Sequence, residues 1–405
     1  MIYLFGALVI LAVAVVCGAV RKLRAWNASL WLPAYVKGDW AGKRESPGPE
    51  ETVHVMFCIA DHFEPGWNGA EPDTQEERVD EWVRRYPAMA DNFRDADGRP
   101  PQHTFFFPAE QYRPELLDTL GELVKAGYGE VEVHLHHDRD TSRGFRTKIA
   151  DFVERLKKHG LLGLDATTGT RRFGFVHGDW ALDNSMPDGS HCGVNDELRI
   201  LKECGCYADF TLPSAPSPAQ TSRINSIYYA EEDPDRSKSH DDGREVGVKQ
   251  PPAGDLMMIQ GPLTMIWPGG RFWLLPRPEN SQLPGGTGLS RRRVDAWMDT
   301  RVCVAGRPEW VFVKLHAHGC PPANRKQLLG PAMEAVYRYL GDTYNDGQQY
   351  RLHYVTAREM YNIVKAAEQG REGNPGRYRD LRVLPPPLQR GHSETATDRE
   401  IVLER

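Results

Sequence analysis

Three histidines and an aspartate close a short apolar run in the middle of the chain. Residues 131–138 read Val-Glu-Val-His-Leu-His-His-Asp, so imidazole and carboxylate groups follow residues that favour a β-strand. His134 and Asp138 have the spacing of a ligand pair on the turn after a strand. Neutral imidazole together with carboxylate suits zinc and similar divalent ions. This segment therefore predicts a metal site.

Two other apolar segments, residues 54–60 and 310–315, also end in ionisable side chains. The side chains that follow them are Asp61, His62 and Glu64 after the first segment, and His316 and His318 after the second. Parallel strands of an α/β barrel bring their carboxyl ends to one face, where such enzymes carry their sites. We therefore expect the three strand ends to form one site.

Several ligand sets are open at this site. His62, His134 and Asp138 could supply three ligands and leave a fourth position open, as a catalytic zinc ion requires. His136 shares a strand face with His134, so these two could also chelate the ion, whereas His137 points elsewhere. The alternative is an ordinary hydrogen-bonded turn.

Proton transfer would fall to two further residues. Asp61 is predicted to be the general base toward water, and His316 is predicted to be the acid that protonates a leaving amine. A pair of surface imidazoles, His316 and His318, is the alternative at the third strand end.

Sugar binding is predicted beside the metal. The stretch 176–184 follows another apolar segment, and His177, Asp179 and Trp180 could bind a sugar by hydrogen bonding and stacking, although Trp180 could equally be structural. Glu64 and His318 are also expected to contact the substrate.

Strand-like and helix-like segments alternate along most of the chain. Strands are predicted at 54–60, 103–107, 131–135, 172–176, 208–212, 310–315 and 352–355, and helices at 74–93, 114–126, 142–159, 196–204, 291–298, 325–340 and 357–368. This order predicts an α/β barrel domain over residues 52–369. An irregular insertion is expected at 213–288, a linker at 25–51 and a disordered tail at 370–405.

The N-terminal segment 1–24 is predicted to be a transmembrane anchor. Its apolar run of about nineteen uncharged residues, Ile2–Val20, would be about 28 Å long as a helix, enough to cross a bilayer. A signal peptide is the alternative, but no basic segment precedes the run. Arg21, Lys22 and Arg24 follow it, which predicts a single-pass protein of a bacterial-type inner membrane with its large domain facing the cytoplasm.

Composition excludes some classes of function. The net charge of −6 over 405 residues gives no basic surface, so no nucleic-acid partner is expected. The seven cysteines have no disulfide-framework spacing, which agrees with a reducing compartment.

The order of these motifs resembles the NodB-homology polysaccharide deacetylases, carbohydrate esterase family 4, over about residues 52–365. Asp61 matches the first position of that family's Asp-Asp motif, and His62 replaces the second. His134 matches the family's H-x-x-x-H motif with Asp138 in place of its second histidine, so the two departures exchange ligands and leave the set unchanged. His316 matches a late Leu-His motif, but the family's Arg-Pro motif has no counterpart in residues 175–184, which leaves the base without its support.

The resemblance implies an incomplete (β/α)7-type barrel and a divalent metal, usually zinc. It also implies hydrolytic removal of N-acetyl groups from a sugar, with Asp61 as base and His316 as acid. Together with the anchor, it implies a carbohydrate substrate in surface polysaccharide or lipid-linked glycan synthesis. The alternatives are a glycoside hydrolase that uses paired carboxylates, and a non-catalytic carbohydrate-binding or assembly protein.

Overall fold

The computed structural model describes residues 2–40, 45–267, 276–285 and 288–390, without the side chains of residues 2, 4, 6–15, 39, 40 and 390. These residues form an α/β fold around a large mixed sheet whose pairing is mostly parallel, which confirms the predicted class. Across the sheet the strands are β12 (Gln282–Leu283), β13 (Trp310–Ala317), β1 (Val53–His62), β2 (His103–Pro108), β3 (Gly129–Leu135), β5 (Arg171–His177), β6 (Cys206–Asp209), β9 (Leu256–Ile259), β7 (Ile227–Ala230) and β8 (Gly243–Glu245). The remaining strands are β14 (Tyr350–Tyr354) beside β1, β4 (Gly163–Asp165) beside β5, β15 (Val383–Leu384) beside β4, and the separate pair β10 (Thr264–Ile266) and β11 (Arg277–Glu279).

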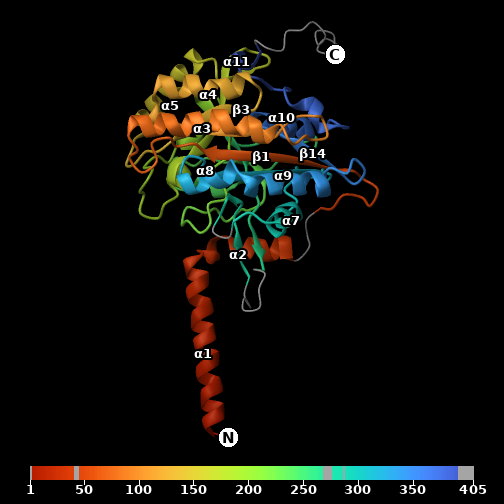
Figure 1. Cartoon of the computed structure of the whole chain (residues 1–405). Coiled ribbons are helices and arrows are strands. Elements are labelled where there is room, and N and C mark those ends of the chain that lie inside the picture. Colours follow the sequence, from red (N-terminus) through yellow and green to blue (C-terminus); the bar gives the residue numbers. More distant parts are fainter. Residues whose placement is uncertain (1, 41–44, 268–275, 286–287, 391–405) are drawn as a thin grey trace.

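Helices connect most of the parallel strands, and Figure 1 shows α3 and α9 on either side of β1. The helices are α1 (Ile2–Ala25), α2 (Ala28–Tyr35), α3 (Pro72–Ala90), α4 (Pro114–Lys125), α5 (Ser142–Lys158), α6 (Glu197–Glu203), α7 (Arg291–Asp299), α8 (Pro322–Leu328), α9 (Pro331–Tyr344), α10 (Ala357–Glu368) and α11 (Pro387–Arg390). Short helical turns are η1 (Val36–Trp40), η2 (Ala109–Gln111), η3 (Gly178–Trp180), η4 (Leu182–Asn184), η5 (Ser239–Asp241) and η6 (Pro375–Tyr378).

The two faces of the sheet pack against different partners. Alternate residues of β1 such as Phe57 join the core that holds Trp82 of α3, and we call this side the outer face. The residues between them, such as Met56, join a second core with Met360 of α10, and we call this side the inner face. Both faces are buried, which explains why the strands are nearly continuous apolar runs in the sequence.

The sheet curls around its inner face. Lys314 of β13 donates from Nζ to the carbonyl oxygens of Phe210 and Leu212, which follow β6 on the other side of the curl, at 2.7 and 2.6 Å. A Cβ built on Gly261 would lie 2.1 Å from the carbonyl oxygen of Lys314, so only glycine fits there. Burial lowers the pKa of Lys314 to about 8. Strand pairing among the described residues does not close the sheet into the predicted barrel.

The segments outside the predicted barrel are more ordered than expected. Part of the predicted linker forms α2, whose Trp31 packs with Ile224 and Leu263. The insertion 213–288 contributes β7, β8 and β9 to the sheet. The predicted helix 325–340 is two helices, because Pro331 has no N–H to continue α8.

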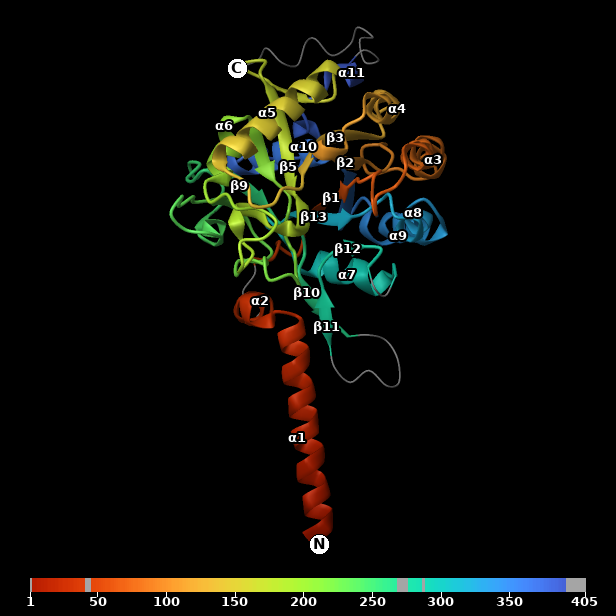
Figure 2. The ribbon, with the colours of Figure 1, turned by 90° about the vertical axis from the view of Figure 1, so that its left-hand side faces the viewer.

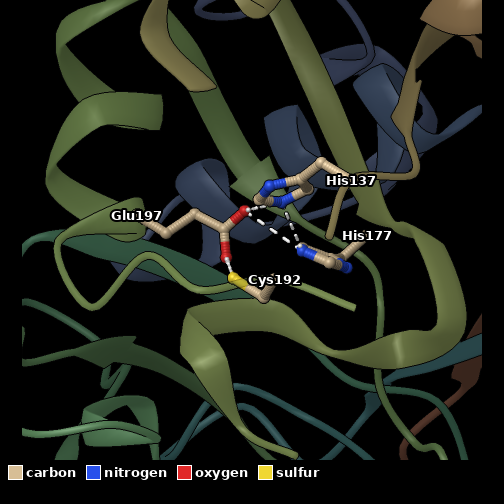
Figure 3. Close-up of side chains that lie close together, drawn as sticks. All are labelled: His137, His177, Cys192 and Glu197. Atoms are coloured by element: carbon tan, nitrogen blue, oxygen red, sulfur yellow. Dashed lines mark hydrogen bonds and ion pairs between the residues drawn. The ribbon is translucent and has the colours of Figure 1, made fainter. Parts of the chain in front are cut away.

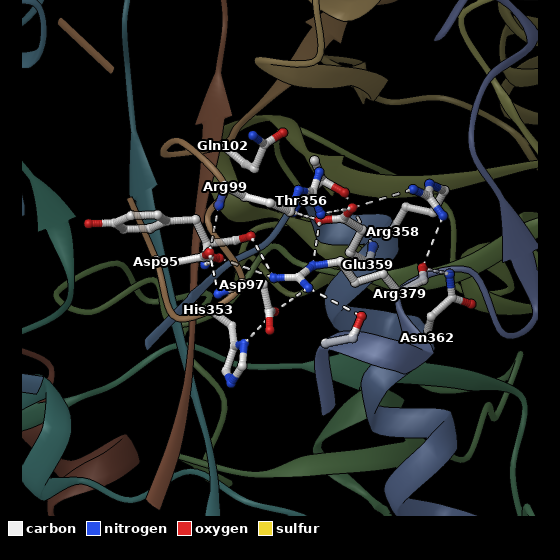
Figure 4. Close-up of polar contacts among 12 residues, drawn as sticks. Asp95, Asp97, Arg99, Gln102, His353, Thr356, Arg358, Glu359, Asn362 and Arg379 are labelled. Atoms are coloured by element: carbon white, nitrogen blue, oxygen red, sulfur yellow. Dashed lines mark hydrogen bonds and ion pairs between the residues drawn. The ribbon is translucent and has the colours of Figure 1, made fainter. Parts of the chain in front are cut away.

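The prediction of a disordered tail is wrong for residues 370–390, which contain η6, β15 and α11, whereas residues 391–405 lie outside the described residues. A polar network holds this segment against the C-terminal end of β14 (Figure 4). Arg379 pairs with Asp95 and Asp97, while Asn362 of α10 donates to the carbonyl oxygens of Arg379 and Val383. Local composition missed this order because the partners of the tail are remote in sequence.

Among the described residues, no helix was found that is both long and apolar enough to span a membrane. The predicted anchor falls on α1, where most side chains between Ile2 and Val15 lie outside the described residues, so the anchor stays a prediction. Figures 1 and 2 show α1 standing away from the rest of the chain.

The contact between His54 and His353 at the N-terminal end of β1 predicts that the stability of the fold depends on pH. Nδ1 of His54 lies 2.8 Å from Nε2 of His353, and burial, followed by the charge of His353, lowers the pKa of His54 to about 4. Between pH 6.5 and pH 4 the unfolded chain therefore binds a proton at His54 that the folded chain does not, so stability falls as the pH falls.

His54→Asn retains an N–H donor without the titrating ring. The unfolding free energy of the parent falls between pH 6.5 and pH 4. In His54→Asn we expect this fall to be smaller by about 1 to 2 kcal/mol, after allowance for solvent around the half-buried ring. Urea unfolding at both pH values measures the difference. An unchanged pH slope in His54→Asn would contradict the assignment.

Candidate metal centre

Alternation along β1 divides the residues at its end between the two faces. His62 and Glu64 continue the inner-face series, whereas Phe63 packs with Trp82 in the outer core. Asp61 belongs to the outer series as well. The inner face therefore receives an imidazole and a carboxylate from this one strand end.

Strand β3 brings two more imidazoles to the same place. His134 directs Nδ1 to the carbonyl oxygen of Val176 at 2.7 Å, so that nitrogen carries the proton and Nε2 presents a lone pair. His136 directs Nδ1 to Oε1 of Glu110 at 2.6 Å, which leaves its Nε2 as an acceptor too. Both free nitrogens face Oε1 of Glu64, at 3.4 Å from His134 and 3.6 Å from His136.

These separations fit a metal ion. Donor atoms about 2.0 to 2.1 Å from a tetrahedral zinc ion lie about 3.3 Å from one another. Glu64, His134 and His136 place their donor atoms within 4.8 Å of one another, and so do His62, Glu64 and His318. The two sets share Glu64, and we call these five side chains the inner cluster.

The remaining members come from β1 and β13. The His62 ring lies 4.9 Å from that of His134 and 4.8 Å from that of His318, and its buried Nε2 has no hydrogen-bond partner among the described residues. Both ring nitrogens of buried His316 also lack such a partner, and its ring is 6.3 Å from that of His62. Buried donor atoms without partners are expected at a site built to bind an ion or a substrate.

Two indoles border the inner cluster. The ring of Trp180, on η3, lies 5.9 Å from that of His318 and 6.2 Å from that of His316. Trp67, on the loop after β1, is 43% exposed and its ring lies 5.8 Å from that of His318. An exposed and a half-buried indole beside a polar centre provide surfaces on which a sugar ring can stack.

Electrostatics differ among the imidazoles: burial lowers the pKa of His136, but its hydrogen bond to Glu110 and the charges of Glu110 and Glu64 outweigh that and raise it. Burial, reinforced by neighbouring imidazoles, holds the pKa of His62 well below its usual range. Burial, reinforced by Lys314, does the same to the pKa of His316, and burial also lowers the pKa of His318. Burial alone would raise the pKa of Glu64, but its hydrogen bond to His134 and the charges of nearby imidazoles outweigh that and lower it. The neutral rings of His62 and His318 and an ionised Glu64 are the forms in which such groups bind a metal ion.

Asp61, the predicted base, lies behind the strand. Its Oδ1 accepts a 2.6 Å hydrogen bond from the Gly319 N–H, and its Oδ2 lies 2.9 Å from Nε2 of His103, on the outer side next to Trp82. The structure therefore does not bring Asp61 into the inner cluster. The sequence indicated no partner for the Asp61 carboxylate, and His103, which was not a candidate site residue, provides one.

Asp138, a predicted ligand, is also elsewhere. Its side chain is 55% exposed and accepts a hydrogen bond from the backbone N–H of His191. Asp179 is likewise half exposed and pairs with the His191 ring. The carboxylate at the centre is Glu64, which the sequence indicated only as a substrate contact.

His177 is fully buried on the outer face and belongs to a second group, with His137, Cys192 and Glu197 (Figure 3). Their donor atoms all lie within 4.8 Å of one another, so this group could hold a metal ion. A substrate role for His177 has no support from this placement.

Neither a family model nor a curated protein matches this chain. Its function must be inferred from the two groups of side chains just described.

Proposed function

We propose that the inner cluster is the active site of a metal-dependent hydrolase that removes N-acetyl or similar acyl groups from a sugar. The observation that carries the proposal is the convergence of His134, His136 and Glu64 on one point, with both imidazole tautomers set by hydrogen bonds. The α/β sheet with its site at the strand ends supports the further proposal of an incomplete (β/α)7-type barrel.

The residues fit a divalent ion, and zinc suits the imidazole and carboxylate donors. Glu64, His134 and His136 would hold it, with His62 and His318 on the other side of Glu64. When bound, the ion would polarise the acyl carbonyl and lower the pKa of a water molecule.

His316 is proposed to move the proton. Its ring is buried and neither nitrogen is engaged by another described group, so both nitrogens are open for proton exchange with water and the leaving amine. Asp61 acts through Gly319, whose N–H it fixes, and therefore positions the end of β13. This differs from the role that the sequence resemblance implies for Asp61.

The carbohydrate part of the proposal rests on the indoles of Trp67 and Trp180 beside the centre. The apolar run Ile2–Val20 supports the further proposals of membrane attachment and a lipid-linked substrate.

The test compares His134→Ala with Asp138→Ala in the full-length chain. His134→Ala is expected to lose one equivalent of zinc in elemental analysis and to release no acetate from N-acetylglucosamine oligomers. Asp138→Ala removes the ligand that the sequence suggested, and we expect it to retain both metal and activity because its side chain is exposed.

Loss of metal in Asp138→Ala, or equal metal content in His134→Ala and the parent, would contradict the proposed centre. New reducing ends without acetate would favour a glycoside hydrolase instead. Binding of the oligomers without any product would favour a carbohydrate-binding protein.

A further inference from the structure

The group on the outer face of β3 and β5 has the composition of a closed metal site. His137 follows β3, His177 ends β5, Glu197 opens α6, and Cys192 lies on the loop between η4 and α6. All four side chains are buried, and Figure 3 shows them directed at one point from separate segments. Structural zinc sites have four protein ligands of this kind and no open position.

The two histidines and the glutamate direct their donor atoms at one point. Nε2 of His137 and Nε2 of His177 are 2.8 Å apart, and each lies 3.2 Å from Oε1 of Glu197. Nδ1 of His177 faces the carbonyl oxygen of Gly178 at 2.5 Å, so the proton of the neutral ring is on that side and Nε2 presents its lone pair inward. His177 therefore presents a lone pair toward Nε2 of His137, and a cation at this point could be held by both rings and by Oε1 of Glu197.

The cysteine adds a sulfur to this group. Sγ of Cys192 lies 3.5 Å from Oε2 of Glu197, the carboxylate whose other oxygen faces both histidines. Two backbone N–H groups, of Asn184 and Val194, point at this sulfur at 3.3 and 3.5 Å. Without a cation, burial and the charge of Glu197 raise the pKa of the Cys192 thiol, whereas these N–H donors favour the thiolate, the form that binds zinc.

Outer contacts hold the other ligands in place. Oε2 of Glu197 accepts a 2.6 Å hydrogen bond from the Asp183 N–H, which leaves Oε1 for the centre. Oδ2 of Asp140 lies 3.3 Å from Nδ1 of His137, but the two make no hydrogen bond. Backbone partners such as the Asp183 N–H and the Gly178 carbonyl oxygen fix the orientation of Glu197 and His177.

We infer that His137, His177, Cys192 and Glu197 form a second, closed zinc site, separate from the inner cluster. The site would link the ends of β3 and β5 to α6 and to the loop 178–196 between β5 and α6, which carries Trp180. Asp179, Trp180, Asp183, Asn184 and His191 on this loop all have positive φ angles of 51° to 62°. Non-glycine residues hold such conformations when surrounding contacts fix them, so the site would set the shape of the loop. The inference does not depend on the proposed function.

Cobalt replacement tests the inference, because only this group contains sulfur. The full-length chain, stripped of metal and reloaded with Co²⁺, is expected to show a near-ultraviolet thiolate-to-cobalt charge-transfer band. Cys192→Ser should abolish the band and lower the cobalt content by one equivalent. Cys320→Ser is the matched control, since Cys320 is also fully buried but belongs to neither group, and it should keep the band.

His134→Ala separates the two centres. It is expected to lose the cobalt of the inner cluster and keep the charge-transfer band. Removal of the remaining ion by a chelator should then lower the melting temperature by about 5 °C or more. A parent protein that binds cobalt without the band, or a band that survives in Cys192→Ser, would overturn the inference. A His134→Ala protein that retains no cobalt would also overturn the inference, because a proton and not a metal ion would then lie between His137 and His177.

Discussion

His316→Asn is expected to lower the turnover number for deacetylation by about 10²- to 10⁴-fold, the usual range for loss of a general acid and base. The metal content should not change, because His316 belongs to neither group of potential ligands. Zinc analysis and the rate of acetate release at saturating substrate measure the two effects separately. A large loss of turnover with intact metal would assign the proton transfer to this ring.

Asp61→Asn is the matched comparison. Asparagine can still accept the Gly319 N–H bond, and the Asp61 side chain lies on the outer face, so we expect at most about a tenfold loss. If Asp61→Asn instead lost as much turnover as His316→Asn, Asp61 would be the base that the sequence resemblance implies. In that case the loop at Gly319 would have to rearrange when substrate binds.

Arg358→Met is expected to destabilise the fold by about 3 to 5 kcal/mol, because it leaves a buried carboxylate without its partner. Arg358 of α10 donates from Nε and Nη2 to Glu130 of β3 at 2.8 to 3.0 Å, and both side chains are buried. Its Nη1 also donates to the carbonyl oxygen of Val383, so the tail would lose a contact as well. Urea unfolding measures the free energy.

Two controls separate charge from packing. Arg139→Met changes an arginine that is 88% exposed and should alter stability by less than about 0.5 kcal/mol. Adding Glu130→Gln to Arg358→Met removes the unpaired charge and should restore a large part of the loss. A double variant no more stable than Arg358→Met would show that the charge of Glu130 is not the cause.

The sequence predicted the framework well because both faces of the parallel strands are buried. Strand β1 was expected at 54–60 and spans Val53–His62, and helix α10 was predicted with its observed bounds. The same reasoning located the strand ends that carry His62, His134 and His316. Helix α10 was recognisable since Thr356 and Glu359 form a capping box at its start.

The site was harder to predict, because its details depend on which face a side chain takes after a strand ends. Asp61 and His62 are adjacent, yet one meets His103 on the outer face and the other meets His134 on the inner face. Side chains continue to alternate between the two faces as far as Glu64. Extending this alternation beyond the predicted strand would have placed Asp61 and His62 on opposite faces. Asp138 had the expected spacing, but it lies on a turn that directs it to solvent.

The second group gave no sequence signal for a different reason. Cys192 and Glu197 lie more than fifty residues from His137, and only the packing of α6 against the sheet brings them together. No short spacing rule describes ligands gathered from four segments.

The place of β1 in the sheet determines when the chain can fold during synthesis. Strand β1 is paired from His54 to Asp61 with β13, which begins about 250 residues later, and from Val53 to Phe57 with β14 beyond that. At a synthesis rate of about 5 to 20 residues per second, β1 waits roughly 10 to 50 s for its neighbour. Until then its Phe57 and Ile59 have no β13 edge to join, and the nascent chain offers an open apolar strand to other chains or to a chaperone.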